Sequence, residues 1–522
     1  MSSDENKSNV SSLLDVNRLD YKLPPSLSIA TSRAMKSYRS TEAVHVAGNS
    51  TVQFQLSTGA TYVDFKNSFL TFQVQIPAVN AAAQGFHYRL PPHTGFANMI
   101  QGYRIIHSSG VELDRQNEGV GEWIQIDDYY QTSKTARKTQ SSLYMLNDTC
   151  LPSTLSHSRN RQEDLFGSVI LEKMNAAVFE AGAVAGDPAG WPGKPYLANN
   201  KNDKFATAQT HEVIIPLAKI CGMFNCDSLA PSFLAAGLRI ELDFYPAKRF
   251  FMNGVDPVVE GALVGISTVA DVLILNPEVH LETFTLTDSM VRKLSQISAA
   301  NGLEWYWDAV HQMNVSTSQQ DLTIQCTRAL SRANSIVCKV RDLSSLSVAV
   351  GDQTKDSINS APWVRSAEEG EYTSDGFPNL YNSTISGAID SFQIQLGAQH
   401  IPSRPLFRRR EIIASALKTF TQFRKAGEKS GPTEAEFAGE RLTNNNAAAT
   451  TPDIYTNGLA IVALPLESSS TLNQSGAAIS AQRTAVINIH FATEAVGMRR
   501  VDTYVTYSKL ATLFLDSVVV RS

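Results

Sequence analysis

The chain has 522 residues, 43% of them hydrophobic and 18% charged, and a formal net charge of −5. This composition excludes a disordered chain, which combines low hydrophobicity with high net charge, and the 45 Lys and Arg against 50 Asp and Glu exclude a chain that is basic throughout, as many nucleic-acid-binding proteins are. From this charge balance we expect no sequence-specific nucleic acid binding. No apolar stretch approaches the roughly 18 residues of a membrane-spanning helix, so we also expect no transmembrane segment.

Residues 1–48 are rich in Ser, Asn and charged side chains and have no sustained hydrophobic period. We interpret them as an N-terminal arm. The first residues lack a basic start followed by an apolar core, so we expect no secretory signal. The five cysteines are few for this length and odd in number, which predicts free thiols in a reducing compartment. They are Cys150, Cys221, Cys226, Cys326 and Cys338.

From residue 51 the hydrophobic period becomes two. Val52, Phe54 and Leu56 alternate with glutamines, a pattern typical of antiparallel strands with one buried face. The same alternation predicts strands at 72–76, 238–244, 322–326, 392–396 and 487–491. Stretches rich in Gly, Pro, Asn and Ser predict long loops at 185–195, 370–379 and 444–452.

Helical patterns are few. Apolar residues at three- and four-residue spacing predict helices at 122–138 and 409–425, and a third at 288–299 with Thr287 as its N-cap. The fold class is therefore all-β with a few inserted helices.

The same order of elements occurs twice along the chain. The first copy has a strand at 102–106, the helix at 122–138, an apolar run ending at 216–217, the strand at 238–244 and a closing strand at 272–275. The second copy has a strand at 392–396, the helix at 409–425, a run ending at 465–466, the strand at 487–491 and a closing strand at 518–520.

This repetition predicts two tandem eight-stranded jelly-roll β-sandwiches. We expect an N-terminal arm at 1–48, a first jelly roll at 49–287, a linker helix at 288–302 and a second jelly roll at 303–522. The fold alone does not define the function.

Four stretches carry a resemblance to a known family. They are FKNSFLTFQV at 65–74, HEVIIPLAKICGMF at 211–224 with LRIEL at 238–242, DVLILNPEV at 271–279, and QIQLG with HIPSRPL at 393–406. In this order they resemble the double jelly-roll major capsid proteins of double-stranded DNA viruses, of the polinton-like virus and virophage type. One departure is His400-Ile401-Pro402, where that family has aromatic residues before the proline.

The resemblance implies a viral structural protein that is not an enzyme. It implies pseudo-hexameric homotrimers that tile an icosahedral virion shell together with neighbouring capsomers and minor capsid or penton proteins. The protein would be made in the host cell and located in the virion capsid. Two alternatives remain, a two-domain jelly-roll carbohydrate-binding protein and a minor capsid or penton protein.

Motif searches predict no catalytic, cofactor-binding or metal-binding residues, and no cofactor. Gly119-Val120-Gly121 lacks the third glycine of a dinucleotide loop and is interpreted as a turn or helix start. Cys221 and Cys226, with His211 nearby, lack the paired spacing of a structural zinc site, so we expect buried free thiols. Cys326 and Cys338 could lie on adjacent strands, but a disulfide needs a geometry that sequence does not reveal.

One cluster of residues in the sequence is acidic. Glu118, Glu122, Asp127 and Asp128 could serve acid–base chemistry or bind Ca²⁺, but they lack the loop pattern of a calcium site, and we expect a solvated or intersubunit face.

The segment from Arg404 to Lys425, which includes Arg408, Arg409, Arg410, Lys418 and Arg424, is expected to be a core-packed helix with a charged outer face. Contact with a neighbouring chain, nucleic acid or a membrane surface stays open for this segment. For Trp305-Tyr306-Trp307 and Trp363 we expect core packing rather than stacking on sugar, with at least one ring of the first run in the core.

Overall fold

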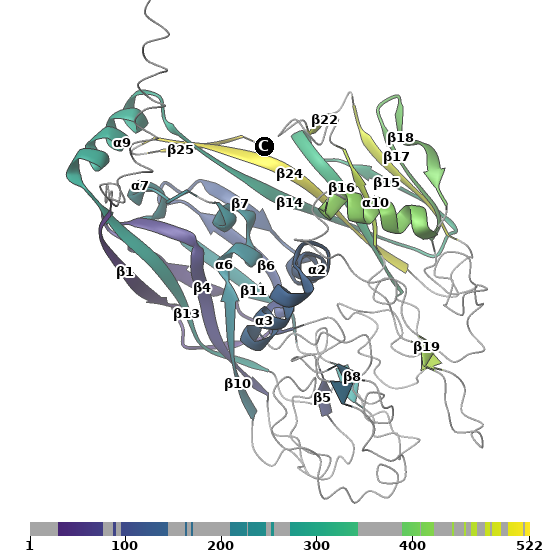
Figure 1. Ribbon diagram of the computed structural model, residues 1–522, viewed down its shortest axis with the longest axis horizontal. Coiled ribbons are helices and arrows are strands. Elements are labelled where there is room, and N and C mark those ends of the chain that lie inside the picture. The colour runs from purple at the N-terminus through teal and green to yellow at the C-terminus, as the bar shows by residue number, and fades with distance from the viewer. Residues whose placement is uncertain are drawn as a thin grey trace, which may run out of the picture.

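The structure is a computed structural model with two β-sandwiches in tandem (Figure 1). It describes residues 30–76, 87–89, 95–144, 162–163, 169–170, 209–226, 228–246, 252–254, 272–342, 389–407, 409–421, 441–442, 454–455, 461–466, 476–480, 483–491, 499–514 and 517–521. The loops expected at 185–195, 370–379 and 444–452 lie outside these residues, as do Cys150, Trp363, Arg408, Arg424 and Lys425.

The first roll consists of two antiparallel sheets. One has the order β1 (Ala30–Arg39), β13 (Leu273–Leu286), β4 (Tyr62–Ile76) and β10 (Gln209–Pro216), with β2 (Val44–Val46) also paired to β13. The other has the order β3 (Val52–Gln55), β11 (Arg239–Phe244), β6 (Ile100–Ile106) and β7 (Glu112–Gln116).

The second roll repeats this construction. One sheet has the order β14 (Leu303–Thr317), β24 (Arg499–Leu513), β16 (Leu330–Asp342) and β21 (Val462–Pro465), with β22 (Ala477–Ile479) on β16 and β25 (Val518–Arg521) on β24. The other has the order β15 (Asp321–Cys326), β23 (Ala485–Phe491), β17 (Ile389–Leu396) and β18 (Gln399–Leu406).

The two rolls share one topology. When the strands on these four paths are counted along the chain within each roll, one sheet reads 1-8-3-6 and the other 2-7-4-5 in both rolls. This double-sheet arrangement is a jelly roll, and it confirms the expected double jelly-roll fold. It also pairs the strands between the rolls, so that β1 is the counterpart of β14, β7 of β18 and β13 of β24.

The counterpart of the closing strand of the first roll is thus β24. The sequence analysis took 518–520 as the closing strand of the second roll. This was wrong, because that segment is β25, an additional strand paired with β24. The alternating pattern of β24 was missed because Asp502, Thr503, Ser508 and Lys509 are polar residues that are nevertheless buried.

The first strand of the first roll also differs from expectation. β1 and β2 lie within residues 1–48, so the expected boundary between arm and roll cuts through the first sandwich. β1 is an edge strand with most of its side chains exposed. A strand without a buried face has no need of hydrophobic alternation, which explains why its sequence resembled an arm.

The predicted helix at 122–138 is interrupted. It is divided into α2 (Val120–Ile126), a π-helical turn η2 (Asp127–Gln131) and α3 (Lys134–Tyr144). Thr132 adopts an extended conformation, and the backbone N–H of Ala136 donates to the Ser133 hydroxyl. Hydroxyl side chains compete for backbone groups in this way and favour a new helix start over continuation.

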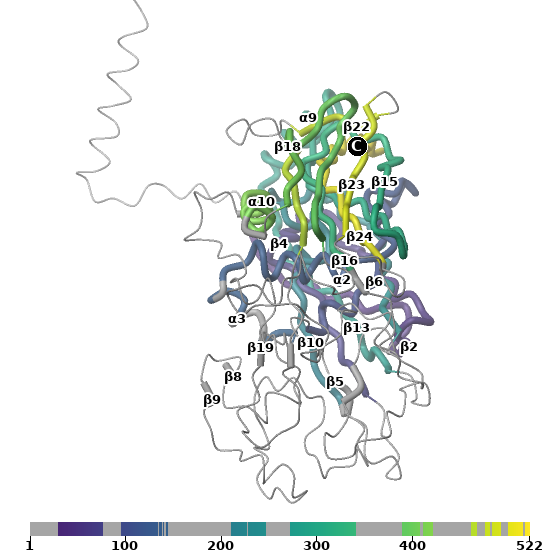
Figure 2. The backbone as a smooth tube through the Cα atoms, turned by 90° about the vertical axis from the view of Figure 1, so that its right-hand side faces the viewer, coloured from purple at the N-terminus to yellow at the C-terminus, as the bar shows by residue number. Residues whose placement is uncertain are grey.

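α9 (Asp288–Ala300) connects the last strand of the first roll with the first strand of the second. Thr287 occupies its N-cap position but makes no capping hydrogen bond through its side chain. α10 (Arg409–Thr421) packs on β21 and contacts η2 of the other roll at the side of the molecule (Figure 2).

Short elements complete the described chain. The helical turns are η1 (Phe96–Met99), α6 (Leu217–Ile220), η3 (Gly222–Asn225) and α7 (Ser232–Ala235). The short strand pairs are β5 (His87–Arg89) with β12 (Met252–Gly254), β8 (Gln162–Glu163) with β9 (Val169–Ile170), and β19 (Arg441–Leu442) with β20 (Ile454–Tyr455).

The core follows the strand alternation. In β23 every second residue from Ala485 to Phe491 is buried, and in β4 the buried set includes Phe65, Leu70 and Phe72. Within the residues that the structure describes, no helix has the length and apolar character needed to cross a membrane.

Candidate functional site: the interface between the two rolls

The second roll meets the first through the sheet that contains β14, β24 and β16, and through α10. β14 of the second roll lies against β7 and η3 of the first. The approach at η3 is close, because a Cβ atom added at Gly222 would lie 1.8 Å from the carbonyl oxygen of Asp308 in β14. Beside it, the Cys226 thiol donates to the carbonyl oxygen of Tyr306 at 3.0 Å. Only glycine at position 222 lets the backbones of η3 and β14 approach this closely.

A buried carboxylate lies at the centre of this interface. Asp114, on β7, accepts hydrogen bonds from two residues of its own roll, Tyr103 Oη at 3.0 Å and Cys221 Sγ at 3.2 Å. Two residues of the second roll also donate to it, Lys509 Nζ at 2.6 Å and Trp307 Nε1 at 3.2 Å. All five side chains are buried. Asp114 is therefore a polar junction between the rolls.

Three of the groups at this junction have shifted pKa values. Burial opposes the charge of Lys509, but attraction to Asp114 outweighs it, and the pKa of Lys509 is raised. Burial, followed by the charge of Asp114, raises the pKa values of the Tyr103 hydroxyl and the Cys221 thiol well above their ordinary values. Both groups therefore stay protonated and donate to the carboxylate. The arrangement joins structural elements of the two rolls.

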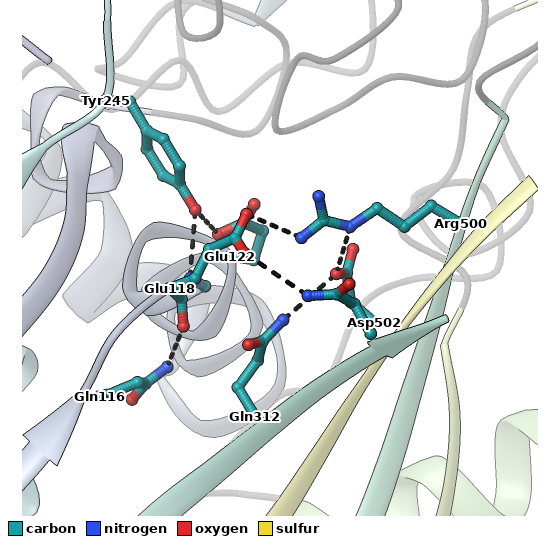
Figure 3. A network of polar contacts seen from close by, with 9 residues as sticks. Gln116, Glu118, Glu122, Tyr245, Gln312, Arg500 and Asp502 are labelled. Atoms are coloured by element: carbon teal, nitrogen blue, oxygen red, sulfur yellow. Dashed lines mark hydrogen bonds and ion pairs between the residues drawn. The ribbon is translucent and has the colours of Figure 1, made fainter. Parts of the chain in front are cut away.

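A second polar cluster lies further along β14 and β24 (Figure 3). Arg500 Nη2 lies 2.7 Å from Glu118 Oε1 of the first roll, and Arg500 Nε lies 2.8 Å from Asp502 Oδ1. Gln312 donates to Asp502 at 3.4 Å, and Asn314 donates to Glu118 at 3.5 Å. Because Asp502 is buried, the guanidinium of Arg500 compensates its charge while binding the other roll.

The start of α2 lies beside this cluster. Gly119 is the residue before the helix and has a φ of 79°, a conformation that favours glycine. Its backbone N–H donates to Tyr245 Oη at 3.2 Å, and Tyr245 Oη donates to Glu122 Oε2 at 2.7 Å. The Trp123 ring lies 5.6 Å from the ring of Tyr504 in β24. The prediction of a turn or helix start at Gly119 is confirmed.

The acidic residues predicted to form one solvated or intersubunit face lie in different environments. Glu122 and Asp128 are fully buried, so the prediction was wrong for these two. Asp128 accepts hydrogen bonds from Lys219 and, at 2.9 Å, from Tyr144, while Asp127 Oδ2 lies 3.1 Å from Lys219 Nζ. Lys219 is distant in sequence, so the local pattern gave no sign of this counter-charge.

The buried charges of Asp128 and Lys219 affect each other's pKa. Burial raises the pKa of Asp128, and Lys219 partly offsets this rise. Burial opposes the charge of Lys219, but the attraction of Asp128 and Asp127 outweighs it and raises the lysine pKa. This ion pair lies within the first roll and fixes η2 to α6.

The basic segment is a core-packed helix in its described part, as predicted. In α10, Ile412, Ala416 and Phe420 are buried, and Lys418 is exposed. The Phe420 ring lies 5.3 Å from the Tyr130 ring of the first roll. Just before the helix, Arg404 Nη2 lies 2.7 Å from Glu411 Oε1.

The remaining positions singled out in the sequence are cysteines, a histidine and tryptophans. Cys221, Cys226, Cys326 and Cys338 are free thiols, and among the described residues no three His, Cys, Asp or Glu side chains form a group that could hold a metal ion. The His211 ring stacks near that of Phe96. Trp305 and Trp307 are buried, which confirms core packing of that run.

No protein-family model and no curated protein sequence matches this chain. Comparison with solved structures finds the Faustovirus major capsid protein, with a TM-score of 0.56, 9% identity, and coverage of 96% of this chain and 94% of that one. It also finds a chain in the structure of the Sputnik virophage, with a TM-score of 0.55, 11% identity, and coverage of 97% and 91%. The likeness establishes a shared double jelly-roll fold over nearly the whole length.

Proposed function

We propose that this chain is the major capsid protein of a double-stranded DNA virus or virus-like element. In this role it assembles as pseudo-hexameric homotrimers into an icosahedral virion shell. The observation that carries the proposal is that one chain contains two rolls of identical strand order joined by a buried, charged interface. The likeness to the Faustovirus major capsid protein supports it.

The geometry of the chain suits a ring. The contact between the rolls is heterologous, because the sheet with β14 and β24 in the second roll meets different elements of the first, β7 and η3 among them. Heterologous contacts generate closed rings when the rotation between units completes a circle. Three copies of a two-roll chain supply six similar units. A ring of six such units has approximate sixfold symmetry, which suits a particle that tiles a shell.

The polar junctions of the interface fit a structural role. The ion pairs of Asp114 with Lys509 and of Glu118 with Arg500 join the rolls and maintain their relative orientation. A shell subunit needs this rigidity and no catalytic residue, so we propose a protein that is not an enzyme. Its partners would be further copies of itself and minor capsid or penton proteins, and its location the virion capsid.

Size-exclusion chromatography with light scattering tests the proposal. We expect a particle of three times the 57.0 kDa chain mass, and larger shells under assembly conditions. Negative-stain images of the trimer should contain six lobes. A chain that stays monomeric under all assembly conditions contradicts the proposal, and a fivefold particle indicates a penton protein instead.

A further inference from the structure

The first strand of each roll is an edge strand, and the two edges have different surroundings. β14 begins the second roll and lies against β7 and η3 of the first. Its counterpart β1 begins the first roll and pairs with β13 on one side. In the described part of the chain, no strand pairs with the other side of β1.

The surface that receives β14 has an unused counterpart too. β7, which β14 contacts, is the last strand of its sheet in the first roll. Its counterpart β18 is the last strand of the corresponding sheet in the second roll, and no further strand pairs with it among the described residues. Each chain therefore presents one edge that corresponds to β14, which is β1, and one edge that corresponds to β7, which is β18.

Large exposed apolar side chains are present at both edges. Met35, in the middle of β1, is 58% exposed, and Val44, in the adjoining β2, is 52% exposed. Phe407, the residue after β18, is 44% exposed. A neighbouring chain that packs on these edges would remove the three side chains from water, which favours contact.

We propose that β1 of one copy packs against the β18 edge of a second copy and thereby repeats, between chains, the contact that β14 makes with β7 within the chain. This inference rests on the proposed function and identifies the surfaces that close the ring. Each copy uses β1 toward one neighbour and β18 toward the other, so three copies satisfy all edges.

The contact is one of side-chain packing rather than strand pairing. β14 and β7 belong to different sheets and exchange no ladder hydrogen bonds. The charges on β1 agree with this arrangement, because Arg33 and Arg39 form ion pairs with Glu282 and Glu278 of β13. Charged side chains on an edge discourage sheet extension, while Met35 remains available for packing.

Substitutions at the two edges test the proposal. Met35→Glu and Phe407→Glu each place a charge at one edge, and we expect each variant to require at least tenfold more protein than the wild type to form trimers. Ile297→Glu on α9 and Val519→Glu on β25 are the controls, because these side chains are 48% and 46% exposed and lie on neither edge. Both controls should remain trimeric, and circular dichroism spectra should verify folding of all four variants.

An equimolar mixture of the two edge variants distinguishes a heterologous contact from a symmetric one. Each variant retains the edge that the other lacks, so the mixture should form one-to-one dimers and no trimers. Folded edge variants that still form trimers as the wild type does would overturn the inference while leaving the proposed function intact. A monomeric wild type would instead overturn the proposed function itself.

Discussion

The carboxylate of Asp114 and the ammonium group of Lys509 lie 2.6 Å apart although 395 residues separate them in the chain. Both are buried, and each belongs to a different roll. Burying two charges is costly, and the cost is offset only where geometry and further hydrogen bonds are favourable. Asp114 meets this condition, because Tyr103, Cys221 and Trp307 also donate to it.

Removal of one partner of this pair should be strongly destabilising. We expect Asp114→Ala to lower the free energy of unfolding by about 3–5 kcal/mol, because it leaves the Lys509 charge buried without compensation. The measurement is urea denaturation followed by fluorescence. The control is Arg104→Ala, which removes partly exposed ion pairs with Glu112 and Glu241 and should have a much smaller effect than Asp114→Ala.

The apolar double variant Asp114→Leu with Lys509→Met separates charge from packing. It removes both charges, so we expect a smaller loss than for Asp114→Ala alone. If Asp114→Ala costs no more than the Arg104 control, the junction contributes little to the association of the rolls.

Gly222→Ala should disturb the contact between the rolls. The added methyl group would lie 1.8 Å from the carbonyl oxygen of Asp308, so η3 and β14 must separate. We expect a loss of about 1–3 kcal/mol, as for overpacking in a core. Differential scanning calorimetry should detect a lower Tm or separate transitions for the two rolls.

Gly59→Ala is the matched control for this change. Gly59 has a φ of 67°, and an added Cβ meets nothing within 4 Å, so only the backbone cost of about 1–2 kcal/mol applies. Its single transition should keep the cooperativity of the wild type. A split transition in the control but not in Gly222→Ala would contradict the assignment.

His311 should make stability depend on pH in the acidic range. Burial, with a smaller contribution from Arg328, lowers the pKa of His311 to about 4 from its ordinary value of 6.5. The unfolded chain thus binds a proton at His311 more readily than the folded chain does. The contribution of His311 to the free energy of unfolding is therefore complete above pH 6.5 and is lost as the pH falls toward 4. Because the side chain is partly exposed, we expect a loss of about 1–2 kcal/mol.

Urea denaturation between pH 4 and 7 measures this contribution. His311→Gln cannot bind the proton, so its stability should vary less over this range than that of the wild type. Equal slopes for both proteins would contradict the prediction.

The buried thiols should be unreactive in the folded protein. Burial raises the pKa of Cys338 to about 12, and burial with the charge of Asp114 raises that of Cys221 well above its ordinary value. Only the thiolate is nucleophilic, so iodoacetamide at pH 8 should leave both cysteines unmodified. Peptide mapping by mass spectrometry tests this, and denaturation before labelling is the control. Labelling of Cys338 in the folded state would indicate opening of the β16–β24 region.

Much of the fold could be predicted from local patterns. The alternation at 487–491 and 238–244 predicted β23 and β11, since a strand with one buried face repeats every second residue. The repeated order of strand, helix, apolar run and strand predicted two similar rolls. The helical spacing at 409–425 predicted the buried face of α10, which spans Arg409–Thr421.

The site could be predicted only in part. β1 was missed because an exposed edge strand has no hydrophobic period, and β24 because its buried residues include Asp502 and Lys509. A buried charge is stable only beside its partner, and the partner of Asp128 or of Asp114 lies far away in sequence.

The sequence by itself determined the all-β class and the duplicated order of elements, because strand and helix periods are local consequences of which side chains avoid water. The tertiary structure alone decided which charges are buried, which surface of the second roll meets the first, and which edges stay exposed. Those outcomes depend on Coulomb attraction and close packing between residues that only folding brings together.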